Sequence, residues 1–296
     1  MLTPPASLPA ALLADRFGLH ALEYVPVGWG SHHWTSVDAA GVRWFVTADL
    51  ASARRERALA AAAALDLDFV VAPAAGPEPI TDEWMATLYP YLSGESFHFG
   101  EWPSAGHRDA VRDMLARLHT APVPAAAARD DLVIEHRDAL AGGFVTAGPY
   151  TDRAAALITD HAAVIRALLG RYDDLVAGAD RSRDVLTHGE PHPGNTMRTA
   201  TGWKLIDWET ALVAPPERDL WLLGGEHSAW SAATGMTVVP AMLILYRLRW
   251  IINDLCVDLH RFRRPHAGTV EDAESWKLLH RNMVAGVPEA LEFTDG

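Results

Sequence analysis

The segment HGEPHPGN (residues 188–195) is followed closely by LIDWE (residues 205–209), and together they hold a dense group of polar side chains. Short runs of β-forming residues flank the polar loop, which predicts a strand, a loop and a returning strand between residues 185 and 209. Such a hairpin would bring four polar side chains together: Glu190, Asn195, Asp207 and Glu209.

These residue types suit the transfer of a phosphoryl group to a hydroxyl. The accepting hydroxyl needs a carboxylate that holds it and takes its proton, and Mg²⁺ needs hard oxygen ligands beside it. Glu190 can supply the first, and Asn195 with Asp207 the second. The spacing from Glu190 to Asn195 equals that between the base and the metal-binding Asn of the kinase catalytic loop, H-R-D-x-x-x-x-N, and His188 matches its His.

HGEPHPGN, LIDWE and the later APPERDLW (residues 214–221) resemble the aminoglycoside phosphotransferase family, which comprises antibiotic and small-molecule kinases with a protein-kinase-like fold. Three further segments are more loosely similar to its nucleotide-covering loop, its hinge and the helix before the catalytic region: VGWGSHHW (27–34), TLYPYLSGES (87–96) and MLARLHTAP (114–122). The resemblance implies Mg²⁺, ATP or GTP as donor, and transfer of the γ-phosphoryl group to a hydroxyl.

The resemblance also implies an α+β, bilobal, protein-kinase-like fold. A small N-terminal lobe with an antiparallel sheet and one main helix is expected over residues 1–93, where it would bind the nucleotide, with a hinge near residues 89–93. A larger, mostly helical lobe is expected over residues 94–296. It would contain the catalytic loop 188–195, the metal-binding segment 205–209 and the helices that bind the acceptor.

Residue patterns along the chain predict the individual elements. Strands are expected within residues 22–50, around turns at 28–30 and 38–41, and within residues 69–92, where a Pro/Gly turn would separate two of them. Residues 121–129 are expected to be a linker. Helices are predicted in six segments: 9–17, 52–68, 107–122, 151–178, 237–263 and 272–284.

Residue by residue, Glu190 aligns with the family's catalytic carboxylate, which is usually Asp, and Asn195 and Asp207 align with its metal ligands. His188 is interpreted as a buried residue that orients the loop. The additional methylene of Glu190 would move the carboxylate by about 1.5 Å, so the acceptor hydroxyl must lie further out or the loop must retract. A structural carboxylate that caps the loop, or a protein without turnover, is the alternative.

The nucleotide is expected to contact the first strand turn, the third strand and the hinge. Gly28 and Gly30 allow a tight turn and a close approach of the backbone to phosphates, although an ordinary hairpin would use them as well. The residues expected to bind the nucleotide are Gly28, Gly30, Ser31, His32, Arg43, Thr47, Tyr89, Tyr91 and Leu92.

The third strand departs from the kinase pattern. In these kinases it carries a Lys that binds the α- and β-phosphates and pairs with a helix Glu. Here VRWFVTADL offers Thr47 and Asp49, and no Lys precedes Lys204. Either nucleotide binding is weak or another cation replaces the Lys, and Arg can bind phosphate bidentately. The candidates are Arg43, Arg54, Arg55 and Arg57, with His32 and His33 in the loop above and Glu56 as the helix acid.

Acceptor binding is assigned to Glu209, Trp208 and Glu226, with a surface carboxylate or core packing as the structural alternative. The chain has 38 Asp plus Glu against 25 Lys plus Arg, a formal net charge of −13, which argues against a nucleic-acid partner. The same charge favours a cationic acceptor such as an aminoglycoside. It does not decide between that class, a macrolide, a nucleoside antibiotic and a primary metabolite such as a sugar or amino alcohol.

The single cysteine excludes an internal disulfide and a zinc site built on paired cysteines. No apolar run approaches the ~18 residues of a membrane span, and the N-terminus lacks the pattern of a signal peptide. We therefore expect a cytoplasmic protein that needs no membrane, and nothing in the sequence indicates an obligate protein partner.

The leading hypothesis is an O-phosphotransferase that acts on an antibiotic and confers resistance or self-protection. A non-catalytic, nucleotide-binding regulatory protein on the same fold is a second interpretation, because the strand Lys is missing and Glu190 replaces Asp. A third interpretation treats His188, Glu190 and His192 as a zinc-hydrolase cluster. Their spacing within a Pro/Gly loop would not place both His side chains on one helical face.

Overall fold

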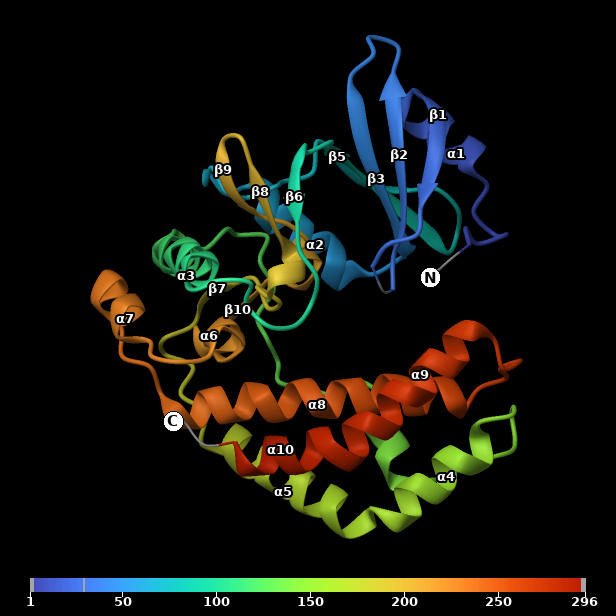
Figure 1. Ribbon diagram of the computed structural model, residues 1–296, viewed down its shortest axis with the longest axis vertical. Helices are drawn as coiled ribbons and strands as arrows, with labels where there is room; N and C mark the ends of the chain where they lie inside the picture. The colour runs from blue at the N-terminus through green and yellow to red at the C-terminus, as the bar shows by residue number, and fades with distance from the viewer. Residues whose placement is uncertain (1–2, 29, 294–296) are drawn as a thin grey trace. The chain divides into compact units, whose positions relative to one another are not determined.

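The structure is a computed structural model that describes residues 3–28 and 30–293 (Figure 1). Its contacts divide the chain into two compact units, each built from segments that are distant in sequence. The first unit comprises the chain up to residue 129, residues 184–214 and residues 228–234. The second comprises residues 130–183, residues 215–227 and the chain from residue 235 onward.

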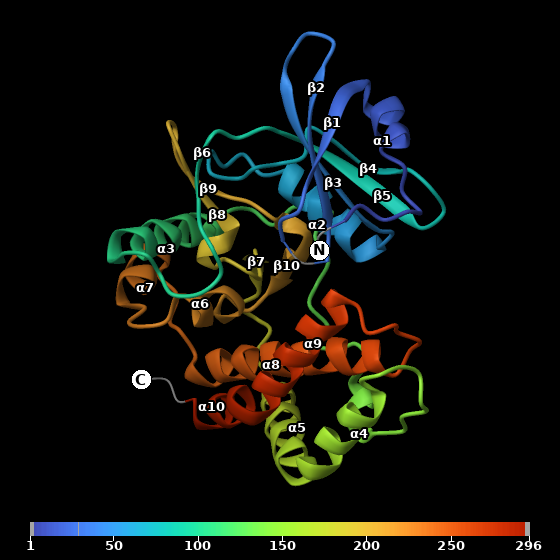
Figure 2. The same ribbon diagram turned by 45° about the vertical axis from the view of Figure 1, so that its right-hand side comes forward.

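A five-stranded sheet dominates the first unit, and neighbouring strands run antiparallel in the order β1-β2-β3-β5-β4. Figure 2 shows this sheet with the helix α1 beside it. The strands are β1 (Leu19–Val25), β2 (His32–Asp38), β3 (Arg43–Leu50), β4 (Ala75–Pro79) and β5 (Trp84–Pro90).

Alternation along the strands gives the sheet two different faces. Trp34 of β2 and Val46 and Ala48 of β3 are almost fully buried in an apolar cluster, against which the helix α1 (Ala10–Phe17) contributes Leu13. The opposite face carries polar side chains from the intervening positions, including Thr47 of β3. The sheet therefore has an apolar face and a polar face, and the polar face carries the candidate site.

The helix α2 (Ala53–Ala63) follows β3 directly and begins at Ser52, whose hydroxyl accepts a hydrogen bond from the backbone N–H of Arg55 at 3.4 Å. This side chain satisfies one of the N–H groups that a helix start leaves unpaired. Ala58, Leu59, Ala61 and Ala62 form the buried side of the helix.

Short strands complete the first unit. One small sheet has the order β6-β8-β9, and β7 pairs with β10 in another. Residues 69–71 join the first sheet to these strands, because Leu205 donates a backbone hydrogen bond to Phe69 and accepts one from Val71. The strands are β6 (Gly94–Ser96), β7 (Val185–Thr187), β8 (Thr196–Thr199), β9 (Gly202–Leu205) and β10 (Leu212–Ala214).

The helix α3 (Ala105–Thr120) packs with the apolar face that its sequence predicts, since Val111, Leu115 and Leu118 are fully buried. The short helix α7 (Ser228–Thr234) contacts α3, and Trp230 donates its indole N–H to Nδ1 of His119 at 3.1 Å. This contact groups residues 228–234 with the first unit.

The second unit is helical. Its helix α8 (Pro240–Phe262) contacts most of the other helices of the unit, and Arg249 of α8 forms a buried ion pair with Asp130, which also accepts a hydrogen bond from Tyr246. The remaining helices are α4 (Thr151–Asp160), α5 (Ala162–Ala177), α6 (Glu217–Leu223), α9 (Val270–Arg281) and α10 (Val287–Glu292), with a 3₁₀ turn η1 (Arg137–Ala141) and a π turn η4 (Asn282–Gly286).

The expected α+β architecture, with an N-terminal antiparallel sheet, one main helix and a largely helical C-terminal part, is confirmed. The division into lobes at residue 93 stays a prediction. The compact units do not follow that boundary, because β6 pairs with β8 and residues 69–71 pair with Leu205.

One predicted turn is wrong. The Pro/Gly stretch AGPEP was expected to separate two strands, yet it forms β4 itself and pairs with β5. Gly76 has a φ of 92°, and a Cβ at this position would lie 2.7 Å from the carbonyl oxygen of Ala86. Glycine thus allows the strand to bulge and to approach its neighbour closely.

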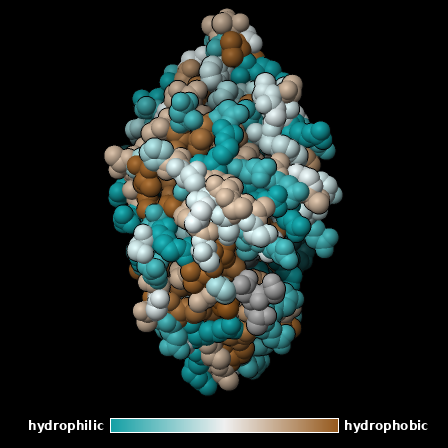
Figure 3. Space-filling model, turned by 90° about the vertical axis from the view of Figure 1, so that its left-hand side faces the viewer, coloured by the Kyte–Doolittle hydropathy of each residue, from teal (hydrophilic) through white to brown (hydrophobic). Residues whose placement is uncertain are grey.

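Within residues 3–28 and 30–293, no helix is both long enough and apolar enough to cross a lipid bilayer. The face drawn in Figure 3 carries small apolar areas interspersed with polar side chains.

Gly94 offers a test of the β6–β8 pairing. A Cβ on this residue would lie 2.5 Å from the carbonyl oxygen of Arg198, so we expect Gly94→Ala to lower the free energy of unfolding by about 1–3 kcal/mol. Gly170 of α5 has no atom within 4 Å of such a Cβ, and Gly170→Ala should raise it by about 0.5–1 kcal/mol. Thermal denaturation of both variants checks the prediction, and equal shifts would contradict it.

Candidate functional site

The backbone of Ile206 joins the two polar segments of the site. Its N–H donates a hydrogen bond to the carbonyl oxygen of Asn195 at 2.9 Å, and its own carbonyl oxygen accepts one from Nε2 of His188 at 2.9 Å. Asp207 is the next residue in the chain. The loop 188–195 and the segment 205–209 are therefore held together through one peptide unit on each side of Ile206.

His188 acts as a brace within this arrangement. Because a carbonyl only accepts, Nε2 of His188 must carry the proton in its bond to Ile206. Nδ1 then accepts the backbone N–H of Glu190 at 3.2 Å. The ring is fully buried and packs edge-on against Trp208 at 4.7 Å between centroids. His188 thus fixes where the chain turns toward Glu190.

Glu190 and Asn195 lie at opposite ends of the loop and are linked directly. Nδ2 of Asn195 donates to the carbonyl oxygen of Glu190 at 3.0 Å. This bond uses the nitrogen end of the amide, so the oxygen Oδ1 is the end that would ligate a metal. The Glu190 side chain is 35% exposed, and its Oε2 lies 4.0 Å from Nε2 of His192. The carboxylate is thus accessible to a small molecule.

Asp207 adopts the left-handed backbone conformation, with a φ of 65°. Loss of solvation and the neighbouring Asp49 together raise the pKa of its carboxyl to about 6, although Arg55 opposes the rise. A nearby cation would relieve this repulsion. The Asn195 and Asp207 oxygens are hard ligands of the type that Mg²⁺ prefers, and Mg²⁺ commonly completes its coordination with phosphates and water. The residues present therefore fit Mg²⁺.

The zinc-hydrolase interpretation finds no support in the site. Among the residues that the structure describes, no three His, Cys, Asp or Glu side chains converge to hold a metal ion. His188 also uses both ring nitrogens for the backbone bonds described above.

A cluster of charged side chains lies beside Asp207. Glu209 lies in the 3₁₀ turn η3 (Trp208–Thr210) and forms an ion pair with Nε of Arg55 at 2.7 Å. Asp49 of β3 lies 3.5 Å from the same guanidinium. Burial raises the pKa of Glu209 to about 9, with further contributions from Asp49 and Asp207. Ser31 donates a hydrogen bond to Asp49. Two carboxyl groups thus hold one guanidinium, which also lowers the pKa of the nearby Asp207.

Several residues expected to bind nucleotide lie on the same face of the sheet as Asp49. Thr47 precedes Asp49 by two positions, and its hydroxyl lies 3.2 Å from Nδ1 of His33. A Cβ on Gly28 would lie 3.2 Å from Nε2 of His33, so Gly28 lies beside this ring. Burial lowers the pKa of His33 to about 4, which makes the ring neutral at pH 7.

Tyr89 of β5 also lies near the acids. Its pKa is raised well above the ordinary value by burial and by Glu209, Asp207 and Asp49. The structure therefore groups six of the expected residues around one face of the sheet: Gly28, Ser31, Thr47, Tyr89, Asp207 and Glu209.

Other expected nucleotide-binding residues lie elsewhere. Arg43 is the first residue of β3, and its guanidinium stacks over the Tyr91 ring at 3.5 Å. Arg43 and Asp49 are about 20 Å apart along the strand. His32 points to the apolar face, where its Nδ1 bonds the Tyr24 hydroxyl at 3.0 Å. Leu92 and Gly30 have no contact with the charged cluster among the interactions that the structure gives, and Trp29 lies outside the described residues.

Trp208 is fully buried and donates its indole N–H to the carbonyl oxygen of Leu205 at 2.8 Å, which favours its structural alternative. Glu226 belongs to the second unit. Glu56, the candidate helix acid, is exposed on α2.

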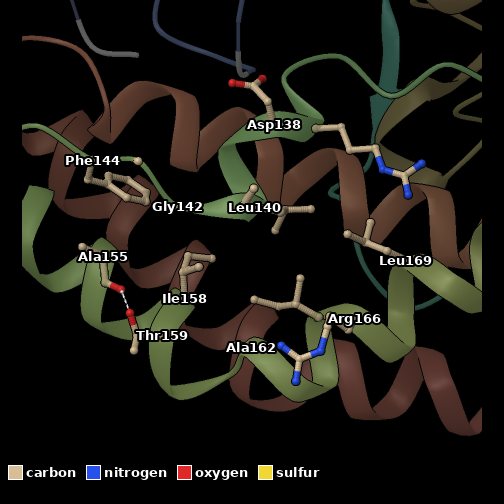
Figure 4. A pocket seen from close by; sticks show the side chains of 14 residues that line it. Asp138, Leu140, Gly142, Phe144, Ala155, Ile158, Thr159, Ala162, Arg166 and Leu169 are labelled. Atoms are coloured by element: carbon tan, nitrogen blue, oxygen red, sulfur yellow. Dashed lines mark hydrogen bonds between the residues drawn. The ribbon is translucent and has the colours of Figure 1, made fainter.

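A cavity of about 790 Å³ lies in the second unit, between the chain after η1 and the helices α4 and α5 (Figure 4). Leu140, Phe144 and Ile158 supply part of its apolar lining. None of the residues assigned to catalysis, nucleotide or acceptor lines it.

Arg55 was one of the four candidate cations, but its ion pairs with Asp49 and Glu209 were not predicted. A usable signal existed, because Thr47 and Asp49 are polar residues at alternate positions of an otherwise apolar strand end. Alternation places them on one face, where a buried carboxylate requires a partner. The identity of that partner depends on how α2 packs, and the sequence alone does not give it.

Comparison with known proteins agrees with these observations. Residues 25–265 match the phosphotransferase enzyme family, abbreviated APH. The chain is 33% identical over 153 residues to Protein StrN of Streptomyces griseus, a match that covers 48% of this chain and 44% of StrN. The matched region thus spans less than half of that relative's length.

Solved structures show the same fold. A spectinomycin phosphotransferase in complex with ADP and spectinomycin has a TM-score of 0.69 at 17% identity, over 93% of each chain. An amicoumacin kinase in complex with AMP-PNP, Ca²⁺ and Ami has a TM-score of 0.59 at 13% identity, over 95% of this chain and 92% of that one.

The sheet, its helix and the braced polar loop define a protein of the kinase-like α+β class. The chain belongs to the phosphotransferase enzyme family. The resemblance noted in the sequence and the kinase-like fold are thereby confirmed.

His192 gives the loop a measurable pH dependence. Burial lowers its pKa to about 4, whereas an unfolded His titrates near 6.5. Between these values the unfolded state binds the additional proton, so stability is lost as the pH falls from 6.5 toward 4. Between pH 7 and pH 5, we expect the free energy of unfolding of His192→Gln to fall by about 2 kcal/mol less than that of the wild type.

Urea denaturation at a series of pH values measures this difference. His98→Gln serves as the control, because His98 is exposed. Parallel pH curves for the wild type and His192→Gln would contradict the assignment.

Proposed function

We propose that this chain transfers the γ-phosphoryl group of ATP or GTP to a hydroxyl group of a small molecule. The observation that carries the proposal is the pair of hydrogen bonds at Ile206, which hold the loop of Glu190 and Asn195 against Asp207. An acid, an amide and a second acid are thus assembled in the order that phosphoryl transfer requires. Membership of the phosphotransferase family supports the same reaction.

Each residue has a distinct task in this proposal. Glu190 orients the acceptor hydroxyl and takes its proton as the oxygen attacks the γ-phosphorus; the bond from that phosphorus to the β–γ bridging oxygen breaks, and the nucleoside diphosphate leaves. Asn195 and Asp207 would hold Mg²⁺, whose charge would offset that of the donor phosphates. His188 keeps Glu190 in position through the backbone and does not exchange a proton, because both of its nitrogens are committed. Catalysis then depends on positioning and electrostatics.

For the acceptor we propose a hydroxylated natural product, most simply an antibiotic of the aminoglycoside, macrolide or nucleoside type. The negative net charge supports a cationic compound. Two proteins of similar fold carry the names of antibiotic kinases, for spectinomycin and for amicoumacin. Resistance or self-protection would be the physiological result. A kinase of a sugar or amino alcohol would use the same residues and differs only in the acceptor.

The test compares the wild type with two variants. With Mg²⁺ and either ATP or GTP, nucleoside diphosphate release is measured across aminoglycoside, macrolide and nucleoside antibiotics and simple amino alcohols. Glu190→Gln should reduce acceptor-dependent release by about 10²–10⁴-fold while nucleotide affinity stays nearly unchanged. Asp207→Asn should weaken both nucleotide binding in Mg²⁺ and turnover, because it removes a metal ligand.

Glu101→Gln is the matched control, since Glu101 is exposed in a loop of the first unit. Glu190→Asp should keep part of the activity, because a carboxylate remains although it is set back by about 1.5 Å. Unchanged turnover in Glu190→Gln would refute the role of Glu190. Nucleotide binding without turnover on any acceptor would favour the regulatory interpretation.

A further inference from the structure

We propose that the ion pair between Asp49 of β3 and Arg55 of α2 is the charge-reversed form of the kinase strand–helix pair, and that Arg55 is the cation that contacts the nucleotide phosphates. This inference rests on the proposed phosphotransferase function. It supplies the phosphate-binding group that the third strand lacks.

The polarity of the pair is the first observation. Protein kinases place a Lys on the third strand and a Glu on the following helix. Here the third strand carries the acid Asp49 and the following helix carries the base Arg55, with a separation of 3.5 Å. The same two elements are joined by an ion pair, and the charges have exchanged places.

The guanidinium of Arg55 is held on three sides. Its Nε pairs with Glu209 at 2.7 Å, one terminal nitrogen lies beside Asp49, and the other donates to the carbonyl oxygen of Leu50 at 3.0 Å. A guanidinium has five N–H groups. Three partners leave N–H groups for phosphate oxygens, and the side chain is 28% exposed, which gives a ligand access.

The position of Arg55 in its helix also supports a role in binding phosphate. Arg55 lies in the first turn of α2, where its backbone N–H is capped by Ser52. A positive charge near a helix N-terminus opposes the helix dipole and is locally unfavourable. Glu209 and Asp49 offset this cost. A locally unfavourable charge held by two acids is typical of a functional site rather than of a solvated helix face.

Asp49 also connects this cation to the strand turn. Ser31, which directly follows the Gly28–Gly30 turn, donates a hydrogen bond to Asp49. The guanidinium of Arg55 and the start of β2 therefore share one carboxylate. A phosphate covered by the turn would lie beside Arg55.

The other candidate cations do not meet these conditions. Arg43 stacks on Tyr91 at the far end of β3. Arg57 donates to the carbonyl oxygen of Ala126 at 3.3 Å. Arg54 is exposed on α2, and His33 is neutral at pH 7 because burial lowers its pKa to about 4. Arg55 is the basic residue that the structure places among the acids of the site.

The experiment measures binding of ADP and GDP in the presence of Mg²⁺, with adenosine and guanosine as ligands that lack phosphate. Arg55→Ala should weaken diphosphate binding by about 10- to 100-fold, because charge-assisted hydrogen bonds to phosphate are lost. Nucleoside binding should change by less than about twofold. Arg54→Ala removes the same charge from an exposed position of the helix and should bind like the wild type. Arg55→Lys should restore part of the affinity.

A charge exchange tests the reversal itself. The double variant Asp49→Lys/Arg55→Glu keeps the net charge and creates the usual kinase polarity, so it should bind ADP or GDP more tightly than Arg55→Glu alone. If the double variant does not fold, Arg55→Ala and Arg55→Lys still decide the question.

Several outcomes would overturn the proposal. Wild-type affinity for the diphosphates in Arg55→Ala excludes a phosphate contact, and an equal loss of nucleoside and diphosphate indicates a structural role. A wild-type protein that binds neither ADP nor GDP overturns both this inference and the proposed function. Diphosphate binding that depends on Arg55, without turnover on any acceptor, refutes the proposed function and leaves this inference standing.

Discussion

The peptide units on either side of Ile206 are the constraint on which the site depends. The carbonyl oxygen of Ile206 accepts a hydrogen bond from the His188 ring, and the N–H of Ile206 donates one to the carbonyl oxygen of Asn195. The pairing of Thr196 with Leu205 brings β8 and β9 together, and these two bonds extend that pairing into the loop before β8 and the segment after β9. A buried imidazole performs this task well, because a neutral ring offers one donor and one acceptor in a rigid plane.

Charge is distributed unevenly around this frame. Asp49, Asp207 and Glu209 lie together with a single guanidinium, that of Arg55, and the pKa values of Asp207 and Glu209 are both raised. Such a site attracts cations and repels bare anions. Under the proposed function, a nucleotide would enter as its metal complex, because a triphosphate without its cation would meet the same repulsion.

Local patterns predicted the parts of the fold that depend on local periodicity. The apolar spacing of residues 107–122 gave the buried face of α3, and the turn at residues 38–41 follows from Asp38, which accepts the backbone N–H groups of Ala40 and Val42. The polar loop was identified because motif order and spacing are preserved in sequence. A turn was predicted where β4 lies, and that prediction was wrong because Gly and Pro also occur at strand bulges, where close pairing requires them.

The contacts of Arg55 could not be predicted, since Asp49, Arg55 and Glu209 come from three elements whose packing depends on the whole unit. Four consecutive charged residues on α2 give no indication of which one faces the sheet. The grouping of residues 228–234 with the first unit was equally out of reach, because it depends on a single helix that packs against α3.

The discontinuous first unit has a consequence for protein synthesis. The last segment of the first unit ends at residue 234, and residues 130–183 of the second unit are all synthesised before β7 and β10. Domains that are continuous in sequence can fold one after another as they leave the ribosome. Here the sheet would emerge long before the strands and the loop that complete the site. A nascent chain must therefore keep its first sheet available until residue 234 has been translated.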